Sequence, residues 1–145
     1  MQNQRPSLFR VIGEDYVSLL SALFPLLFWI YSAYSLFVRD DSTQFFVLLS
    51  AAVTAVAIPL LLWRYRTIAS VFEDGMEAPG TITAINFFRG RGRVSYVYTF
   101  QGQKYSSGNA INRTKHSKNL EVGKQVTIFI DPGNPKRAFV KEIYL

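Results

Sequence analysis

Residues 16–38 read YVSLLSALFPLLFWIYSAYSLFV, and residues 42–63 read STQFFVLLSAAVTAVAIPLLLW. Neither stretch contains a charged residue. An α-helix of about 20 residues crosses the hydrocarbon core of a bilayer, which is about 30 Å thick, so both stretches are long enough. The rest of a 145-residue chain is too short to bury two such helices inside a soluble core. We therefore predict two transmembrane helices, over residues 16–38 and about 43–63.

The connector between these helices, residues 39–44, is short and polar, so the helices must run antiparallel as one hairpin that ends at Arg66. The positive-inside rule places the side that carries Arg5, Arg10, Arg64 and Arg66 in the cytoplasm. We therefore expect a multi-pass protein of the bacterial inner membrane. Both termini, including the first 15 residues, and the domain that follows the hairpin are expected to be cytoplasmic.

A cleaved signal peptide is the alternative interpretation of the first apolar stretch, with residues 33–35 as the cleavage site. Glu14 and Asp15 argue against it, because they stand where a signal peptide carries positive charge. The apolar stretch is also longer than the core of a typical signal peptide.

Two further patterns describe the hairpin. Trp63, Arg64, Tyr65 and Arg66 are typical of an anchor at the membrane interface, with rings at the headgroups and guanidinium groups on phosphates. Small residues recur at four-residue spacing in the second helix and would allow close helix packing, either within the hairpin or on another subunit. These residues are Ser50, Ala51, Thr54 and Ala55. An ion-coupled transporter is disfavoured because neither span contains an ionisable side chain of the kind that moves protons.

The second half of the chain is basic and rich in short β-type runs. The chain has a net charge of +6, and every Lys and Arg except Arg5, Arg10 and Arg39 follows Trp63. Residues 67–79 are expected to form a helical extension and linker, in which Gly75 supplies a left-handed C-cap. A β domain of about five strands should follow over residues 80–145, as a small barrel of the OB-like or SH3-like kind. The expected strands are 81–88, 94–100, 103–107, 125–130 and 138–144.

Several motifs of this region belong together. Gly80 opens the first strand, Tyr96, Tyr98 and Phe100 line the second, and residues 123–129 read GKQVTIF before an Asp-Pro-Gly-Asn-Pro turn at 131–135. This pattern, over about residues 78–145, resembles the bacterial domain-of-unknown-function 3592 family. The resemblance implies a small β domain, often beside membrane helices, with no established activity. A looser resemblance is to the membrane-anchored oligonucleotide-fold barrels of the NfeD proteins.

Basic residues gather in two predicted loops of the β domain. Both loops either bind an anion or a partner, such as lipid phosphate, nucleic acid or an acidic protein, or are simply solvated. The first loop holds Arg89, Arg91 and Arg93, and the second holds Arg113, Lys115 and Lys118.

We find no residue pattern that would support catalysis. The chain has no cysteine and one histidine, His116, which is expected to be an exposed loop residue without metal-ligand companions. The aromatic side chains of 96–100 either stack on bases or, as we prefer, pack in the barrel core. We therefore expect no catalytic residue, no cofactor and no metal.

Three functions remain. We expect a non-enzymatic accessory, assembly or adaptor subunit that presents a cytoplasmic β domain to a protein partner or forms a homo-oligomer. The first alternative is a membrane protein that gives immunity to, or defends against, a membrane-active toxin. The second is a module that binds anionic lipid headgroups or nucleic acid through the basic loops, and nucleic acid is the less favoured ligand.

Overall fold

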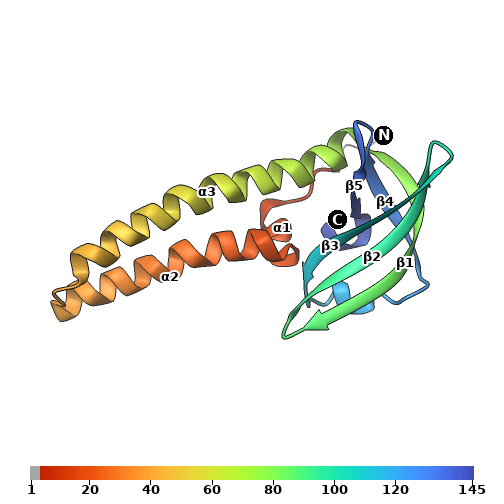
Figure 1. Cartoon of the computed structure of the whole chain (residues 1–145). Coiled ribbons are helices and arrows are strands. Elements are labelled where there is room, and N and C mark those ends of the chain that lie inside the picture. Colours follow the sequence, from red (N-terminus) through yellow and green to blue (C-terminus); the bar gives the residue numbers. More distant parts are fainter. Residues whose placement is uncertain (1–3) are drawn as a thin grey trace.

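The computed structural model describes residues 4–145, which form a helical hairpin followed by a β barrel (Figure 1). The helices are α1 (Leu8–Glu14), α2 (Tyr16–Val38), α3 (Thr43–Asp74) and α4 (Lys141–Tyr144). The strands are β1 (Met76–Phe88), β2 (Arg91–Phe100), β3 (Gln103–Asn112), β4 (Gln125–Asp131) and β5 (Asn134–Val140), and a short 3-10 helix spans Ser117–Asn119.

Helices α2 and α3 lie side by side and extend away from the barrel (Figure 1). Both are long and apolar enough to cross a membrane. In their most apolar segments only 22% and 17% of the residues are buried, so the protein itself covers little of their surface. Each helix continues through its proline, Pro25 in α2 and Pro59 in α3.

Helix α3 links the hairpin to the barrel without a break. It is 32 residues long, which corresponds to about 48 Å. Its last turns place Ile68, Val71 and Phe72 in the barrel core, and the Phe72 ring centroid lies 4.7 Å from that of Phe129. One end of the barrel is therefore closed by the same helix that forms half of the hairpin.

The expected left-handed C-cap of α3 is wrong. Gly75 has φ −76° and ψ 165°, which is extended backbone. Glycine is required there by space, since a Cβ atom would lie 2.0 Å from the carbonyl oxygen of Val71 and 2.9 Å from that of Ile130. Strand β1 consequently starts directly after the helix, at Met76, ahead of the boundary expected at Gly80.

The five strands form a nearly closed barrel with the order β3-β2-β1-β4-β5, in which all paired neighbours are antiparallel. Strand β5 returns beside β3. Ser107 contacts Lys136 and Asn109 contacts Ala138, so residue numbers rise together and the closing pair is parallel. This arrangement is that of an OB-type barrel. The prediction of a two-helix hairpin with a small five-stranded barrel is confirmed.

The end of the chain differs from expectation. Strand β5 stops at Val140, and α4 follows where a strand to Tyr144 was predicted. Ile143 and Tyr144 are buried beneath the barrel wall, so a single helical turn lets both side chains enter the core. The turn before β5 forms as expected, because Asp131 Oδ1 accepts a hydrogen bond of 2.9 Å from the Gly133 N–H.

The aromatic side chains of β2 face the core, which contradicts the base-stacking alternative. Tyr96 is fully buried, and its hydroxyl donates to the carbonyl oxygen of Ala138 at 2.6 Å and lies 3.0 Å from Oδ1 of Asn109. The Asn109 amide also donates to Ala138, at 3.1 Å. Strands β3 and β5, at the two ends of the sheet, meet at a seam without backbone pairing. Side-chain hydrogen bonds join β5 to β2 and β3 there instead.

We predict that Tyr96→Phe destabilises the protein by about 1–3 kcal/mol, because it removes the buried hydroxyl that contacts both the Ala138 carbonyl oxygen and the Asn109 side chain. Tyr105→Phe is the matched control, since the Tyr105 hydroxyl bonds only the exposed side chain of Gln103. It should change stability by less than about 0.5 kcal/mol. Chemical unfolding of the full chain in mild detergent measures both variants, and equal effects would contradict the role of Tyr96 at the seam.

Candidate functional site: the polar junction between hairpin and barrel

Asp15 lies between α1 and α2 and is completely buried. Its Oδ2 caps α2 by accepting hydrogen bonds from Ser18, at 2.9 Å from the backbone N–H and 2.8 Å from the hydroxyl. The guanidinium group of Arg64 donates to both carboxylate oxygens, at 2.8 Å and 3.2 Å. Because α2 and α3 are antiparallel, this bidentate ion pair joins the barrel-side ends of the two helices.

Glu14 turns the other way and joins α1 to the loop after β3. It is 3% exposed, and its Oε2 accepts a hydrogen bond of 2.6 Å from the Thr114 hydroxyl. Its Oε1 lies 2.8 Å from Nδ1 of His116. The Asn112 side-chain amide adds a bond of 2.8 Å to the Gly13 carbonyl oxygen. His116 is thus a partner of a buried carboxylate and not merely an exposed loop residue.

We call Glu14, Asp15, Arg64, Thr114 and His116 the polar junction. Two neighbouring carboxylates bind opposite halves of the molecule, so the hairpin and the barrel are held in one orientation. Contacts of the N-terminal segment reinforce this arrangement at three further points. Arg10 Nε donates to the Ile143 carbonyl oxygen at 3.1 Å, and the Tyr65 hydroxyl donates to the Pro6 carbonyl oxygen at 3.2 Å. Arg5 Nε lies 2.9 Å from Glu73 Oε1.

The four residues predicted as an interface anchor divide into two pairs. Arg64 is engaged by Asp15, and Tyr65 is half-buried beneath the N-terminal segment. Trp63 and Arg66 remain exposed at the end of the apolar part of α3. Of the four predicted anchor residues, only these two are therefore exposed.

The two basic clusters meet at one end of the barrel. The Arg113 backbone N–H donates a hydrogen bond of 2.7 Å to the Gly90 carbonyl oxygen, which brings the second loop beside the β1–β2 turn. Arg93 lies further along β2, against Gly108. Lys115 and Lys118 are exposed in the loop that carries His116. Within residues 4–145 none of the six predicted cations, Arg89, Arg91, Arg93, Arg113, Lys115 and Lys118, forms an ion pair.

The small residues of α3 face two directions. Ser50 is buried in the hairpin, where its hydroxyl lies 2.7 Å from that of Ser32, and Thr54 Oγ1 accepts a bond of 2.9 Å from Trp29 Nε1. Ala51 and Ala55 are exposed on the outer side. The first pair packs within the hairpin and the second pair is left uncovered.

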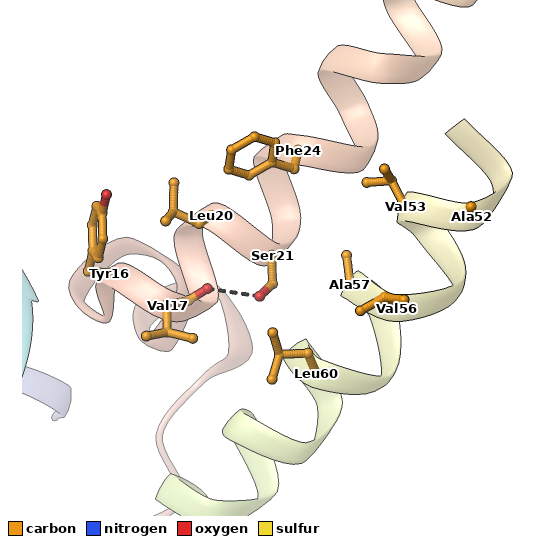
Figure 2. A pocket seen from close by; sticks show the side chains of 10 residues that line it. All are labelled: Tyr16, Val17, Leu20, Ser21, Phe24, Ala52, Val53, Val56, Ala57 and Leu60. Carbon is orange, nitrogen blue, oxygen red and sulfur yellow. Dashed lines mark hydrogen bonds between the residues drawn. The ribbon is translucent and has the colours of Figure 1, made fainter. Parts of the chain in front are cut away.

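Near the barrel the two helices diverge and leave an apolar groove of about 530 Å³. Figure 2 shows side chains from α2 and α3 lining it from opposite sides, with the Ser21 hydroxyl bonded to the Val17 carbonyl oxygen. The groove therefore has almost no free polar group. Its lining consists of Tyr16, Val17, Leu20, Ser21, Phe24, Ala52, Val53, Val56, Ala57 and Leu60.

The polar junction holds charge but does not have the geometry of a catalytic triad. Thr114 and His116 both bond the Glu14 carboxylate, whereas a triad requires the histidine to contact the hydroxyl. In the part of the chain that the structure describes, no three His, Cys, Asp or Glu side chains gather as a metal site.

Burial raises the pKa of Tyr96 and raises that of Tyr98 to about 12, so both phenols stay protonated as donors.

Sequence reasoning used Glu14 and Asp15 only as an argument against a signal peptide and missed their structural role. A signal was present, because Asp15 stands immediately before an uncharged helical run, with Ser18 three residues later, as an N-cap does. The antiparallel hairpin also brings residues 15 and 64 to the same end. The contacts of Glu14 with Thr114 and His116 had no such signal, because they join positions about 100 residues apart.

We predict that Asp15→Asn destabilises the chain by about 3 kcal/mol, because it keeps an N-cap side chain but leaves the largely buried Arg64 unpaired. Asp15→Asn/Arg64→Gln should recover part of this loss, with a coupling free energy of about 1–3 kcal/mol. Asp41→Asn, in the exposed connector, is the control and should be neutral. Thermal unfolding in detergent tests the cycle, and additive single effects would contradict the coupling.

The comparisons with known proteins bear on the barrel. Residues 78–142, most of the β domain, match the family model described as Domain of unknown function (DUF3592). No curated protein and no solved structure gives a significant match to the chain. The resemblance to the DUF3592 family that the glycine, aromatic and Asp-Pro motifs indicated is thereby confirmed for the β domain.

Proposed function

We propose that this chain is an integral membrane protein without enzymatic activity, an accessory or assembly subunit that holds its β domain at the membrane surface for a protein partner. The observation that carries the proposal is the continuity of α3. The helix passes from an apolar span directly into the barrel core, where Phe72 packs against Phe129.

The rigid connection favours a presenting role over a tethered one. A barrel on a flexible linker would sample many orientations, whereas this barrel is fixed by α3, by the polar junction and by the N-terminal segment. Burying Glu14 and Asp15 is costly unless each is paired, and both are. Such a construction suits a subunit that offers one defined face of its barrel to a neighbouring protein.

The hairpin supplies a second surface for association. Ala51 and Ala55 lie on the exposed outer side of α3, where small side chains permit another helix to approach closely. The groove lies on the other side of the same helix, so the two surfaces are separate. The partner we propose is a membrane protein whose helix packs on the Ala51–Ala55 side, and a second copy of the chain is the alternative occupant.

The orientation we propose places the barrel and both termini in the cytoplasm of a bacterial cell. The positive-inside rule counts Lys and Arg close to the ends of the spans, and Arg5, Arg10, Arg64 and Arg66 lie at the barrel end of the hairpin. The connector carries Arg39 beside Asp40 and Asp41.

Cysteine labelling tests this topology cleanly, because the chain contains no cysteine. We predict that Asp41→Cys in the connector and Lys104→Cys in the barrel react with a membrane-impermeant maleimide from opposite sides of sealed vesicles. In inverted inner-membrane vesicles only Lys104→Cys should react, and detergent should expose both. Labelling of both sites without detergent, or extraction of the protein by alkaline carbonate, would refute a membrane-spanning hairpin.

Partner binding is tested with Ala51→Leu/Ala55→Leu, which enlarges the outer side of α3 without altering the polar junction. We predict that crosslinking in intact membranes captures one membrane protein at constant stoichiometry and that this variant loses it by tenfold or more. Val56→Leu on the groove side is the control. Unchanged capture by the double variant would contradict docking on this side, and capture of the chain alone would establish self-association in place of a partner.

A further inference from the structure

The turn between β1 and β2 lies beside the beginning of α2, at the end of the barrel that faces the hairpin (Figure 1). The opposite turn, between β2 and β3, points away from the hairpin (Figure 1). Arg89 with φ 49° and Gly90 with φ 85° form the tip. A hollow of about 340 Å³ separates this tip from Tyr16 and Leu19 of α2.

Two arginines, Arg89 and Arg91, line the hollow, and the guanidinium of a third, Arg113, lies nearby, 5.8 Å from the centre of the Phe87 ring. The Arg91 guanidinium donates to the Tyr16 hydroxyl and lies 5.1 Å from the centre of the Tyr16 ring. The Arg89 guanidinium lies 5.2 Å from the centre of the Phe88 ring. Arg113 is held beside the tip by its backbone bond to Gly90. Among residues 4–145 none of the three has a carboxylate partner, so their charge is available to an anion.

The surroundings of these arginines are apolar on the side of the hairpin. Phe88, the last residue of β1, is 62% exposed at the tip. Tyr16 is the first residue of the uncharged run, and Leu19 lies one turn further into it. The tip is thus at the level where headgroups meet hydrocarbon if α2 enters a bilayer at Tyr16.

We propose that the β1–β2 tip binds the phosphate of an anionic phospholipid, with Arg89 and Arg91 at the phosphate, Arg113 adding positive charge beside the tip, and Phe88 in the interface. Arginine is suited to this because its planar donors match phosphate oxygens. A free phosphate ion would use the same donors. The lipid is favoured because Phe88 and Leu19 give the hollow an apolar wall that an inorganic ion does not contact. The inference rests on the proposed membrane insertion and adds a ligand to it.

The test uses full-length protein in detergent, titrated with phosphatidylglycerol or phosphatidylcholine, with bound lipid counted by native mass spectrometry. The wild type should prefer phosphatidylglycerol. Arg89→Asn should weaken that lipid about fivefold, since one basic residue near anionic headgroups contributes about that factor. Asparagine tolerates the positive φ of this position, so the turn should be retained. Lys104→Asn, at the far end of the barrel, is the charge-matched control and should have no effect.

Phe88→Ser provides a second variant that changes no charge. It should reduce the affinity for phosphatidylglycerol and leave that for inorganic phosphate unchanged. Equal losses for Arg89→Asn and Lys104→Asn, or no preference between the two lipids, would overturn the proposal. Inorganic phosphate that competes at the same concentration as the lipid would assign the site to a free anion and would also overturn it. Failure of membrane insertion itself is detected separately by carbonate extraction, so the two proposals fail in distinguishable ways.

Discussion

The bidentate ion pair between Asp15 and Arg64 is the contact on which the rest of the structure depends. Neither charge can enter a bilayer without a large cost, so each must stay at the end of its apolar run. The antiparallel hairpin brings these two ends together, and the pair neutralises both charges while Asp15 also caps α2. A single buried carboxylate therefore determines where α2 begins and how it meets α3. Glu14, the residue before Asp15, accepts a hydrogen bond from Thr114 and so links this end of the hairpin to the barrel.

The barrel in turn depends on the helices for closure. Its strands are paired by backbone bonds from β3 through to β5, but the last seam relies on Tyr96, Asn109 and Ser107, which bond the backbone of β5. The last turns of α3 fill one end of the barrel. Val11 of α1 and Ile143 of α4 also pack in its core. A β domain of this size buries few residues by itself, so these helical contributions complete its core. The end of α3 and the barrel consequently share one hydrophobic core.

Charge is distributed according to the same geometry. At the barrel end of the hairpin, Glu14, Asp15 and Glu73 are paired with side chains of the protein, whereas among residues 4–145 the arginines of the β1–β2 tip have no carboxylate partner. Two of these arginines, Arg89 and Arg91, line the hollow beside the beginning of α2. This asymmetry places arginines without carboxylate partners next to the apolar hairpin. An aromatic side chain, Phe88, lies at the same end, while the tyrosines of β2 are turned inward.

The sequence by itself determined the hairpin, the five strands and the Asp131 turn, because each is a local pattern of uncharged length, alternation or turn chemistry. It also identified the basic residues, but as two separate clusters. Only the tertiary structure decided that Arg113 lies beside Gly90, that Arg64 is engaged by Asp15, and that the carbonyl oxygen of Ile130 leaves no room for a Cβ atom at Gly75. The physical reason is that these features depend on atoms far apart in the chain. Local sequence patterns determine which segments form helices and strands. The contacts between these segments are determined only when the barrel packs on α3.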